Sequence, residues 1–187
     1  MLELGCGDGA NTLAIAQTLP HARVIGIDAA AAAIERGREI ARVAGLENAE
    51  LRVGDLADLR RVEALAPVDY IIAHGVYSWI PPRLRSALLE CCCRCLAPHG
   101  VAFVSYNAYP GSYLRDMARD ILEFHLRGVS APAERVARAR QLMETIATAE
   151  SPSPYARVLR EHLQRMLTAS DALLYHDDLA PVSTPFY

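Results

Sequence analysis

A glycine-rich stretch near the start of the chain constrains its fold more than any other feature. Residues 3–9 read Glu-Leu-Gly-Cys-Gly-Asp-Gly and lie between a short apolar run and a stretch of helical periodicity. Glycines at a strand-to-helix junction let the backbone turn sharply and approach a ligand closely, while the start of the helix presents backbone amides. The stretch therefore predicts a β-α unit whose turn binds a nucleotide-like ligand, with a plain structural turn as the alternative.

Up to about residue 107, short apolar runs alternate with longer amphipathic stretches, which is typical of β-α-β units and a parallel sheet. We expect strands at residues 1–4, 23–28, 50–54, 68–73 and 101–106, and helices at 10–19, 30–44 and 83–96, with a short further helix at 58–65. Beyond Pro110 the periodicity is helical only, at 113–127, 132–149 and 155–174. The prediction is an α/β protein with a Rossmann-like core over 1–110 and a helical extension of the same domain over 111–187.

Acidic residues near the ends of three expected strands narrow the choice of ligand. Asp28 ends the second strand, where a carboxylate can accept hydrogen bonds from both hydroxyls of an adenosine ribose. Glu3 precedes the first glycine of the loop, and Asp55 follows the third strand. Gly5-x-Gly7-x-x-Ala10 also satisfies the dinucleotide pattern, so an NAD-dependent Rossmann enzyme remains an alternative. The three carboxylates favour S-adenosylmethionine, whose ammonium, ribose and adenine amino group all donate hydrogen bonds.

Taken together, residues 3–9, 26–28, 54–56, 69–72 and 96–101 resemble the class I S-adenosylmethionine-dependent methyltransferases. The resemblance implies a Rossmann-like sheet with the cofactor bound above the first strand. It also implies that the glycines of the loop line the methionine end of the cofactor, that Asp28 binds the ribose, and that Asp55 with Leu56 holds the adenine. The expected cofactor-binding residues are Glu3, Gly5, Gly7, Gly9, Asp28, Asp55, Leu56 and His74.

A narrower resemblance lies in residues 73–81, 105–111 and 173–179. They are similar to bacterial methyltransferases that carry a methyltransferase regulatory domain, a group related to the rickettsial protein-lysine methyltransferases. This resemblance implies methyl transfer to a protein side chain, with a lysine amine as the acceptor in the protein-lysine members. Relative to that group the chain begins inside the first strand and stops before the last two strands, so we expect a truncated core. A non-catalytic binding module is the alternative that truncation leaves open.

Aromatic residues follow two adjacent strands of the expected sheet, where ligands bind in open parallel sheets. Their faces can hold an amine or a methylated ammonium by cation–π contact, and ordinary packing is the alternative. The expected substrate-binding residues are Tyr77, Trp79, Tyr106, Asn107 and Tyr109. The expected catalytic residues, as proton acceptors or orienting groups, are His74, Tyr77 and Tyr109.

Composition excludes several other classes of protein. All 19 basic side chains are arginine and the net charge is -3, which argues against nucleic acid as a partner.

No apolar run is long enough to span a membrane and no signal peptide precedes the first strand, so we expect a cytoplasmic protein. Cys92 and Cys95 form a C-x-x-C pair without a second pair, so we expect packing residues and no metal site. Nothing in the sequence predicts the oligomeric state.

Overall fold

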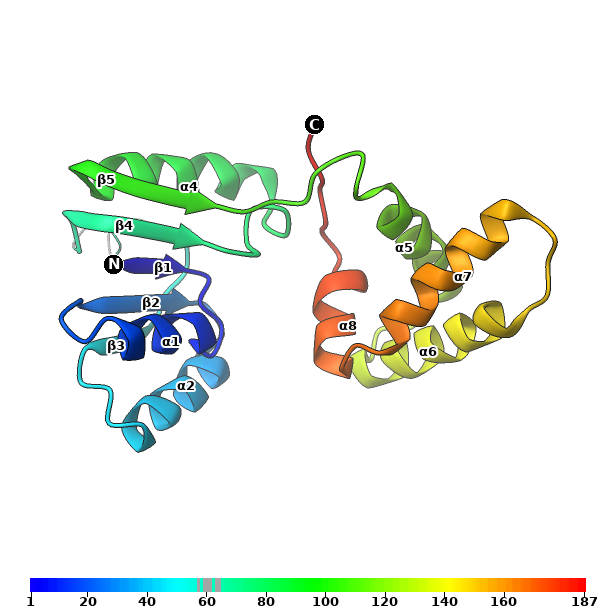
Figure 1. Ribbon diagram of the computed structural model, residues 1–187, viewed down its shortest axis with the longest axis horizontal. Helices are drawn as coiled ribbons and strands as arrows, with labels where there is room; N and C mark the ends of the chain where they lie inside the picture. Colours follow the sequence, from blue (N-terminus) through cyan, green and yellow to red (C-terminus); the bar gives the residue numbers. More distant parts are fainter. Residues whose placement is uncertain (57, 59–61, 63–64) are drawn as a thin grey trace. The chain divides into compact units, whose positions relative to one another are not determined.

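The computed structural model describes residues 1–56, 58, 62 and 65–187 (Figure 1). The chain divides into two compact units, Met1–Tyr106 and Asn107–Tyr187, and each is described by itself. The first unit ends at Tyr106, close to residue 110, where the sequence pattern predicts the end of the Rossmann-like core. The short helix expected at 58–65 lies outside the described residues for most of its length.

The first unit is built on one parallel sheet of five strands in the order β3-β2-β1-β4-β5. The strands are β1 (Leu2–Leu4), β2 (Val24–Asp28), β3 (Ala49–Val53), β4 (Val68–Ala73) and β5 (Leu96–Val104). The helices among the described residues of this unit are α1 (Ala10–Thr18), α2 (Ala31–Val43) and α4 (Pro82–Cys95). The order 3-2-1-4-5 with helices between strands confirms the Rossmann-like α/β fold predicted from the alternating pattern.

The larger of two core clusters in the first unit lies between the sheet and α4, and the smaller one includes Leu13 of α1 and Ile34 of α2. Leu2 and Leu4 of β1 and Ile71 of β4 have no exposed surface, as central parallel strands require. Three cysteines of α4 (Cys91, Cys92 and Cys95) pack into the same cluster beside Leu88, whereas Cys93 is exposed. Three of the four cysteines of α4 therefore lie on its buried face, and the thiol of Cys93 lies on the exposed face.

The start of β5 differs from the prediction. The sequence pattern places this strand at 101–106 after a turn at Pro98, but the strand begins at Leu96, directly after α4. Leu96 pairs with Val68 and Val101 pairs with Tyr70, so a bulge separates the two pairings. Pro98 lies between these two pairings and has no N–H to donate. This is consistent with an interruption in the hydrogen bonding between β4 and β5 rather than with a turn.

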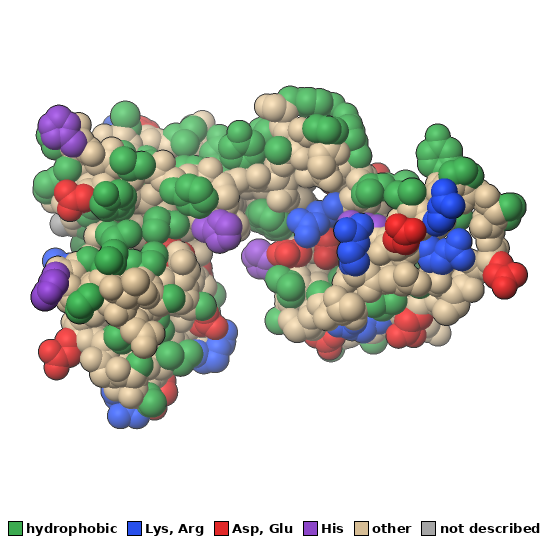
Figure 2. Space-filling view, in the orientation of Figure 1, with side chains coloured by type: hydrophobic (Ala, Val, Ile, Leu, Met, Phe, Trp, Pro, Cys, Tyr) green, Lys and Arg blue, Asp and Glu red, His purple; other side chains and the backbone are tan. Residues whose placement is uncertain are grey.

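One face of β4 and β5 stays partly open. Tyr70, Val101 and Phe103 expose 51%, 55% and 55% of their surface. Figure 2 shows hydrophobic side chains gathered over these two strands in the first unit. With His74, and with Asn11 and Ile15 of α1, they line a groove of about 400 Å³.

The second unit contains α5 (Tyr113–His125), α6 (Pro132–Thr148), α7 (Pro154–Leu167) and α8 (Asp171–Asp178). Its core is formed by fully or almost fully buried side chains from all four helices, among them Leu122, Met143, Leu163 and Leu174. In the described part of the chain, no helix has the length and apolarity that crossing a membrane requires.

The prediction of one helix over 155–174 is wrong, because the chain breaks it into α7 and α8. Ser170 caps α8, and its hydroxyl accepts a hydrogen bond of 3.3 Å from the backbone N–H of Leu173. Arg140 of α6 holds the break in place by donating to the carbonyl oxygens of Leu167 and Ala169 at 3.0 and 2.6 Å. Its guanidinium also forms an ion pair with Asp171.

Candidate functional site

The glycine loop joins β1 to α1 in a conformation that requires glycine. Gly5, Gly7 and Gly9 have φ angles of 72°, 59° and 80°, in the left-handed region. A Cβ on Gly5 would stand 2.4 Å from Cγ2 of Val76, so this glycine also makes room for a neighbouring loop. By contrast, no described atom lies within 4 Å of a Cβ on Gly7, so that side of the loop is open to a ligand.

Asp28, at the end of β2, is joined to the loop. Its Oδ2 accepts a hydrogen bond of 2.8 Å from the backbone N–H of Gly7, and its Oδ1 accepts one of 2.8 Å from the N–H of Ala30. The carboxylate therefore links the glycine loop to the start of α2. A carboxylate has about four acceptor sites, so each oxygen can still accept one further hydrogen bond.

Glu3 has contacts that sequence reasoning did not predict. It is 4% exposed, and its Oε1 accepts a hydrogen bond of 2.9 Å from Nδ2 of Asn11. Its Oε2 accepts a short hydrogen bond from Oγ1 of Thr12. Both partners lie in the first turn of α1, so this buried carboxylate fixes the helix relative to β1. Its expected contact with the cofactor remains a prediction.

Asp55 and Leu56 follow the third strand, as predicted. Asp55 lines a cavity of about 470 Å³ together with Ile27, Arg38 and Gly54. Leu56 is partly buried against the main core cluster. The cavity lies at the carboxyl ends of β2 and β3, the edge at which Rossmann-like sheets bind nucleotides.

His74 follows β4 and is held by a residue that the sequence analysis did not select. Nδ1 of His74 lies 3.0 Å from Oγ of Ser105, which also accepts a hydrogen bond of 2.9 Å from the N–H of Gly75. Ser105 thus connects the ends of β4 and β5 and orients an exposed imidazole. The sequence did offer a signal for Ser105, because it begins the motif at residues 105–111 and directly precedes Tyr106.

Two of the predicted aromatic residues come together in the first unit. The rings of Tyr77 and Tyr106 have centroids 6.4 Å apart. The guanidinium of Arg85 lies 6.0 Å from the Tyr77 ring and donates to the Tyr77 carbonyl oxygen. Trp79 follows in the same turn, where its backbone N–H donates a hydrogen bond of 2.9 Å to the carbonyl oxygen of Val76.

Asn107 and Tyr109 belong to the second unit. The hydroxyl of Tyr109 donates a hydrogen bond of 2.7 Å to Oδ2 of Asp116, and this bond raises the pKa of Tyr109 to about 12. The phenol therefore keeps its proton at neutral pH. Asp116, Tyr113 and Tyr187, which surround Tyr109, were missed by sequence reasoning.

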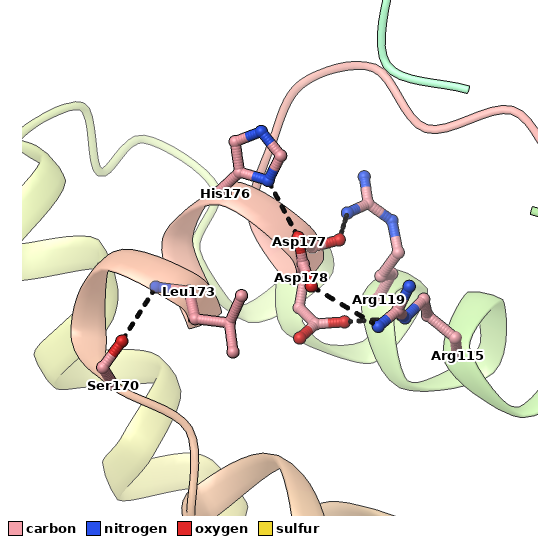
Figure 3. Close-up of polar contacts among 7 residues, drawn as sticks. All are labelled: Arg115, Arg119, Ser170, Leu173, His176, Asp177 and Asp178. Carbon is pink, nitrogen blue, oxygen red and sulfur yellow. Dashed lines mark hydrogen bonds and ion pairs between the residues drawn. The ribbon is translucent and has the colours of Figure 1, made fainter. Parts of the chain in front are cut away.

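The His176-Asp177-Asp178 motif at the end of α8 is tied to α5 by two arginines (Figure 3). Nε of Arg115 lies 3.2 Å from Oδ1 of Asp178, and Arg119 donates to the carbonyl oxygen of Asp177 at 3.1 Å. Nδ1 of His176 lies 2.8 Å from Oδ1 of Asp177. Burial raises the pKa of Asp178. These contacts give the motif a role in joining two helices.

The described residues contain no group of three or more histidine, cysteine or acidic side chains arranged to hold a metal ion. Sγ of Cys91 and Sγ of Cys95 lie 3.7 Å apart inside the core. Burial raises the pKa of Cys92 and, to about 12, that of Cys6 in the glycine loop. Buried thiols of this kind are protonated and inert.

The loop fits the adenosine cofactor expected from the sequence. The open side of Gly7 allows the backbone to approach a ligand, and Asp28 beside it has acceptor capacity left for hydroxyl groups. Asp55 supplies a second carboxylate at a cavity along the same edge of the sheet.

Comparison with known proteins gives the same result. Residues 1–100 match the family described as Methyltransferase domain. An uncharacterized protein of Rickettsia prowazekii is 32% identical over 189 residues, covering all of this chain and 75% of that protein. Trans-aconitate 2-methyltransferase of Azoarcus sp. is 34% identical over 102 residues, which cover 54% of this chain and 36% of that protein.

Among solved structures, PKMT2 from Rickettsia typhi in complex with AdoHcy matches with a TM-score of 0.83 and 34% identity. The match covers 100% of this chain and 36% of that one, so the chain spans about a third of the length of PKMT2. The family match over more than half of the chain and the parallel sheet with its glycine loop agree. The chain belongs to the class I S-adenosylmethionine-dependent methyltransferases, and its cofactor is S-adenosylmethionine.

Proposed function

We propose that this protein methylates a side-chain amine of another protein, with lysine as the acceptor. The observation that carries the proposal is the extent of the match to PKMT2, which includes the helical unit Asn107–Tyr187. Trans-aconitate 2-methyltransferase of Azoarcus sp., in contrast, aligns with only 54% of this chain. The helical unit therefore supports the protein-lysine group among the methyltransferases.

With S-adenosylmethionine bound, the available chemistry is transfer of a methyl group to a nucleophile. In this proposal the glycine loop and Glu3 hold its methionine end, Asp28 accepts hydrogen bonds from the ribose, and Asp55 with Leu56 binds the adenine. Preorganisation supports these roles, because Asp28 is already fixed by two backbone N–H groups before any ligand binds.

An amine must be uncharged before it can act as a nucleophile, so a proton acceptor is needed. We assign this role to His74. When Nδ1–H of His74 donates to Ser105, Nε2 is free of hydrogen and able to accept a proton. Tyr109 keeps its own proton, because its hydrogen bond to Asp116 raises its pKa to about 12, so it does not serve as the base.

In this proposal the aromatic side chains of Tyr77, Trp79 and Tyr106 form the walls for the acceptor side chain. The 6.4 Å spacing of the Tyr77 and Tyr106 rings supports a shared aromatic surface in the first unit. Aromatic faces stabilise an amine and its methylated product by about 0.5–2 kcal/mol each.

Two measurements test the proposal. The first is calorimetric titration of the 187-residue chain with S-adenosylhomocysteine and, separately, with NADH. The second is incubation with S-adenosylmethionine that carries a tritiated methyl group, in the presence of a lysine-rich protein or of RNA. Hydrolysis of the labelled protein identifies the methylated residue. The chain itself contains no lysine, so any methyl-lysine recovered comes from the substrate.

We expect binding of S-adenosylhomocysteine and label in methyl-lysine, with none in RNA. Tighter binding of NADH would instead support a dinucleotide enzyme. Binding of S-adenosylhomocysteine without any label would support a non-catalytic binding module. Label in RNA would contradict the assignment of the acceptor.

Substitution of His74 by glutamine tests the proton acceptor. Loss of a general base lowers the rate of methyl transfer by about 10²–10⁴-fold near neutral pH. The deficit should shrink at high pH, because the substrate amine then loses its proton to solvent. If the loss of rate in His74→Gln is the same at every pH, His74 is not the base.

Trp79→Ala tests the aromatic wall. It should lower labelling of the protein substrate while the affinity for S-adenosylhomocysteine is kept. Tyr155→Ala, at an 83% exposed tyrosine of α7, is the control.

A further inference from the structure

Three tyrosines and one carboxylate gather at one place in the second unit. Tyr109 precedes α5, Tyr113 is its first residue, and Asp116 follows in its first turn. Tyr187 joins them because the chain near its end pairs with residues 107–109. The N–H of Tyr109 donates to the carbonyl oxygen of Phe186 at 2.8 Å, and Ala108 and Phe186 form a parallel bridge.

The three rings form a continuous aromatic surface, which we call the tyrosine cluster (Tyr109, Tyr113 and Tyr187). The ring centroid of Tyr109 lies 4.6 Å from that of Tyr113 and 4.9 Å from that of Tyr187. The hydroxyls of Tyr113 and Tyr187 are in direct hydrogen-bonding contact. Tyr113 is 51% exposed, so much of its ring faces solvent instead of packing into the core.

The charge beside the tyrosine cluster is negative. Asp116 accepts the hydrogen bond of Tyr109, and within the described part of the chain no arginine or histidine forms an ion pair with it. The neighbouring Arg115 is directed to Asp177 and Asp178 at 3.8 and 3.2 Å. An exposed aromatic surface next to an uncompensated carboxylate attracts cations and repels phosphates.

We propose that the tyrosine cluster and Asp116 bind an alkylammonium group, namely the N-methylated side chain of a lysine. The inference rests on the proposed function, since it gives the methylated product a binding surface of its own. Methylation of an amine keeps its positive charge but removes N–H donors and weakens its hydration. Aromatic faces with a nearby carboxylate suit such a cation better than a compact, strongly hydrated ammonium.

The test is an NMR titration of the full chain, without S-adenosylmethionine, with three small probes. They are the amide of Nα-acetyl-Nε-trimethyllysine, the same compound without the methyl groups, and its neutral analogue with carbon in place of the ε nitrogen. We expect the trimethylated cation to bind more tightly than either of the other two. Equal binding of the neutral analogue would overturn the proposal, because shape rather than charge would then explain the affinity.

Variants locate the site. Tyr113→Ala and Tyr187→Ala should each weaken binding of the trimethylated probe by about two- to fivefold, the effect of losing one exposed cation–π contact. Asp116→Asn should weaken the cation in the same way without affecting the neutral analogue. Tyr155→Ala and Asp120→Asn, at exposed positions of the same unit, are the matched controls. Unchanged affinity in Tyr113→Ala and Tyr187→Ala, both still folded by circular dichroism, would place the site elsewhere.

The outcome is separable from that of the methylation assay, because the probes are titrated without cofactor. Absence of probe binding in a chain that methylates lysine overturns this inference alone. Probe binding with the expected variant effects in a chain that labels no protein supports the ammonium site and contradicts the proposed activity.

Discussion

The backbone N–H of Gly7 donates a 2.8 Å hydrogen bond to the carboxylate of Asp28. The two residues belong to different β-α turns, and the bond locks one to the other. The loop conformation and the position of the carboxylate are therefore coupled, so that a change at Asp28 affects the glycine loop as well as any ligand that Asp28 contacts.

Replacement of Asp28 by alanine should weaken binding of S-adenosylhomocysteine by roughly 10–100-fold, since hydrogen bonds to a charged group are worth about 1.5–3 kcal/mol. The affinity of Asp28→Asn for S-adenosylhomocysteine should lie between those of the wild type and Asp28→Ala, because the amide keeps one acceptor oxygen. Calorimetric titration measures the dissociation constants. Asp69→Ala is the control, since Asp69 is an exposed carboxylate in the first half of β4. An unchanged constant in Asp28→Ala would remove Asp28 from the binding site.

Glu3 should contribute to stability through its buried hydrogen bonds to α1. Thr12→Val removes the donor to Oε2 and leaves a buried carboxylate oxygen without it, at a cost of about 1–3 kcal/mol in the free energy of unfolding. Urea denaturation measures the change. Thr18→Val is a matched control, because the Thr18 hydroxyl only donates to the Ala14 carbonyl oxygen at an exposed position. Equal effects of the two substitutions would show that Glu3 does not fix the helix.

The cysteines should differ in reactivity. Cys93 is exposed and should be alkylated first, whereas Cys91 and Cys95 are fully buried. Cys6 should resist alkylation at pH 8, because its pKa of about 12 leaves almost none of the reactive thiolate. Mass spectrometry of partially alkylated protein gives the order of reaction.

The purified protein should contain no stoichiometric zinc, and a chelator should leave its Tm unchanged. One zinc per chain by elemental analysis would contradict this prediction.

Asp178 should make the stability of the protein depend on pH. Burial raises its pKa in the folded state above the ordinary 3.8, so the folded chain binds this proton more tightly than the unfolded chain. The free energy of unfolding of the wild type relative to Asp178→Asn should therefore fall as the pH rises from below 3.8 through the folded-state pKa. Denaturation of both proteins across this range measures the difference. A difference that grows with pH would show that Arg115 outweighs burial.

Much of the fold could be predicted because its signals are local. The apolar runs, the glycine loop and Asp28 indicate a β-α-β pattern through residues that are neighbours along the chain, whereas the order of the strands in the sheet comes from the structure. Sequence reasoning missed the break before α8 because the apolar periodicity continues across it. The feature that marks the start of α8 is a cap formed by the single hydroxyl group of Ser170. The early start of β5 depends on pairing with Val68, which no local pattern reveals.

The candidate site was predictable only in part, for the same reason. Residues that follow strands could be selected from position alone, as His74 and Tyr77 were. Ser105 contacts His74, and Asp116 accepts a hydrogen bond from Tyr109, so the roles of Ser105 and Asp116 appear only once the chain is folded. Tyr187 reaches Tyr109 through a bridge between segments far apart in the sequence.

Arg140 reaches three places from one side chain: the end of α7, the link that follows it and the start of α8. In the stretch between the two helices, the backbone N–H groups of Thr168 and Ala169 donate to the carbonyl oxygens of Arg165 and Met166, both at 3.1 Å. We expect the backbone amides of this stretch to exchange with deuterium at the pace of the helices on either side. The second unit would then open as one cooperative block rather than fraying from its last helix.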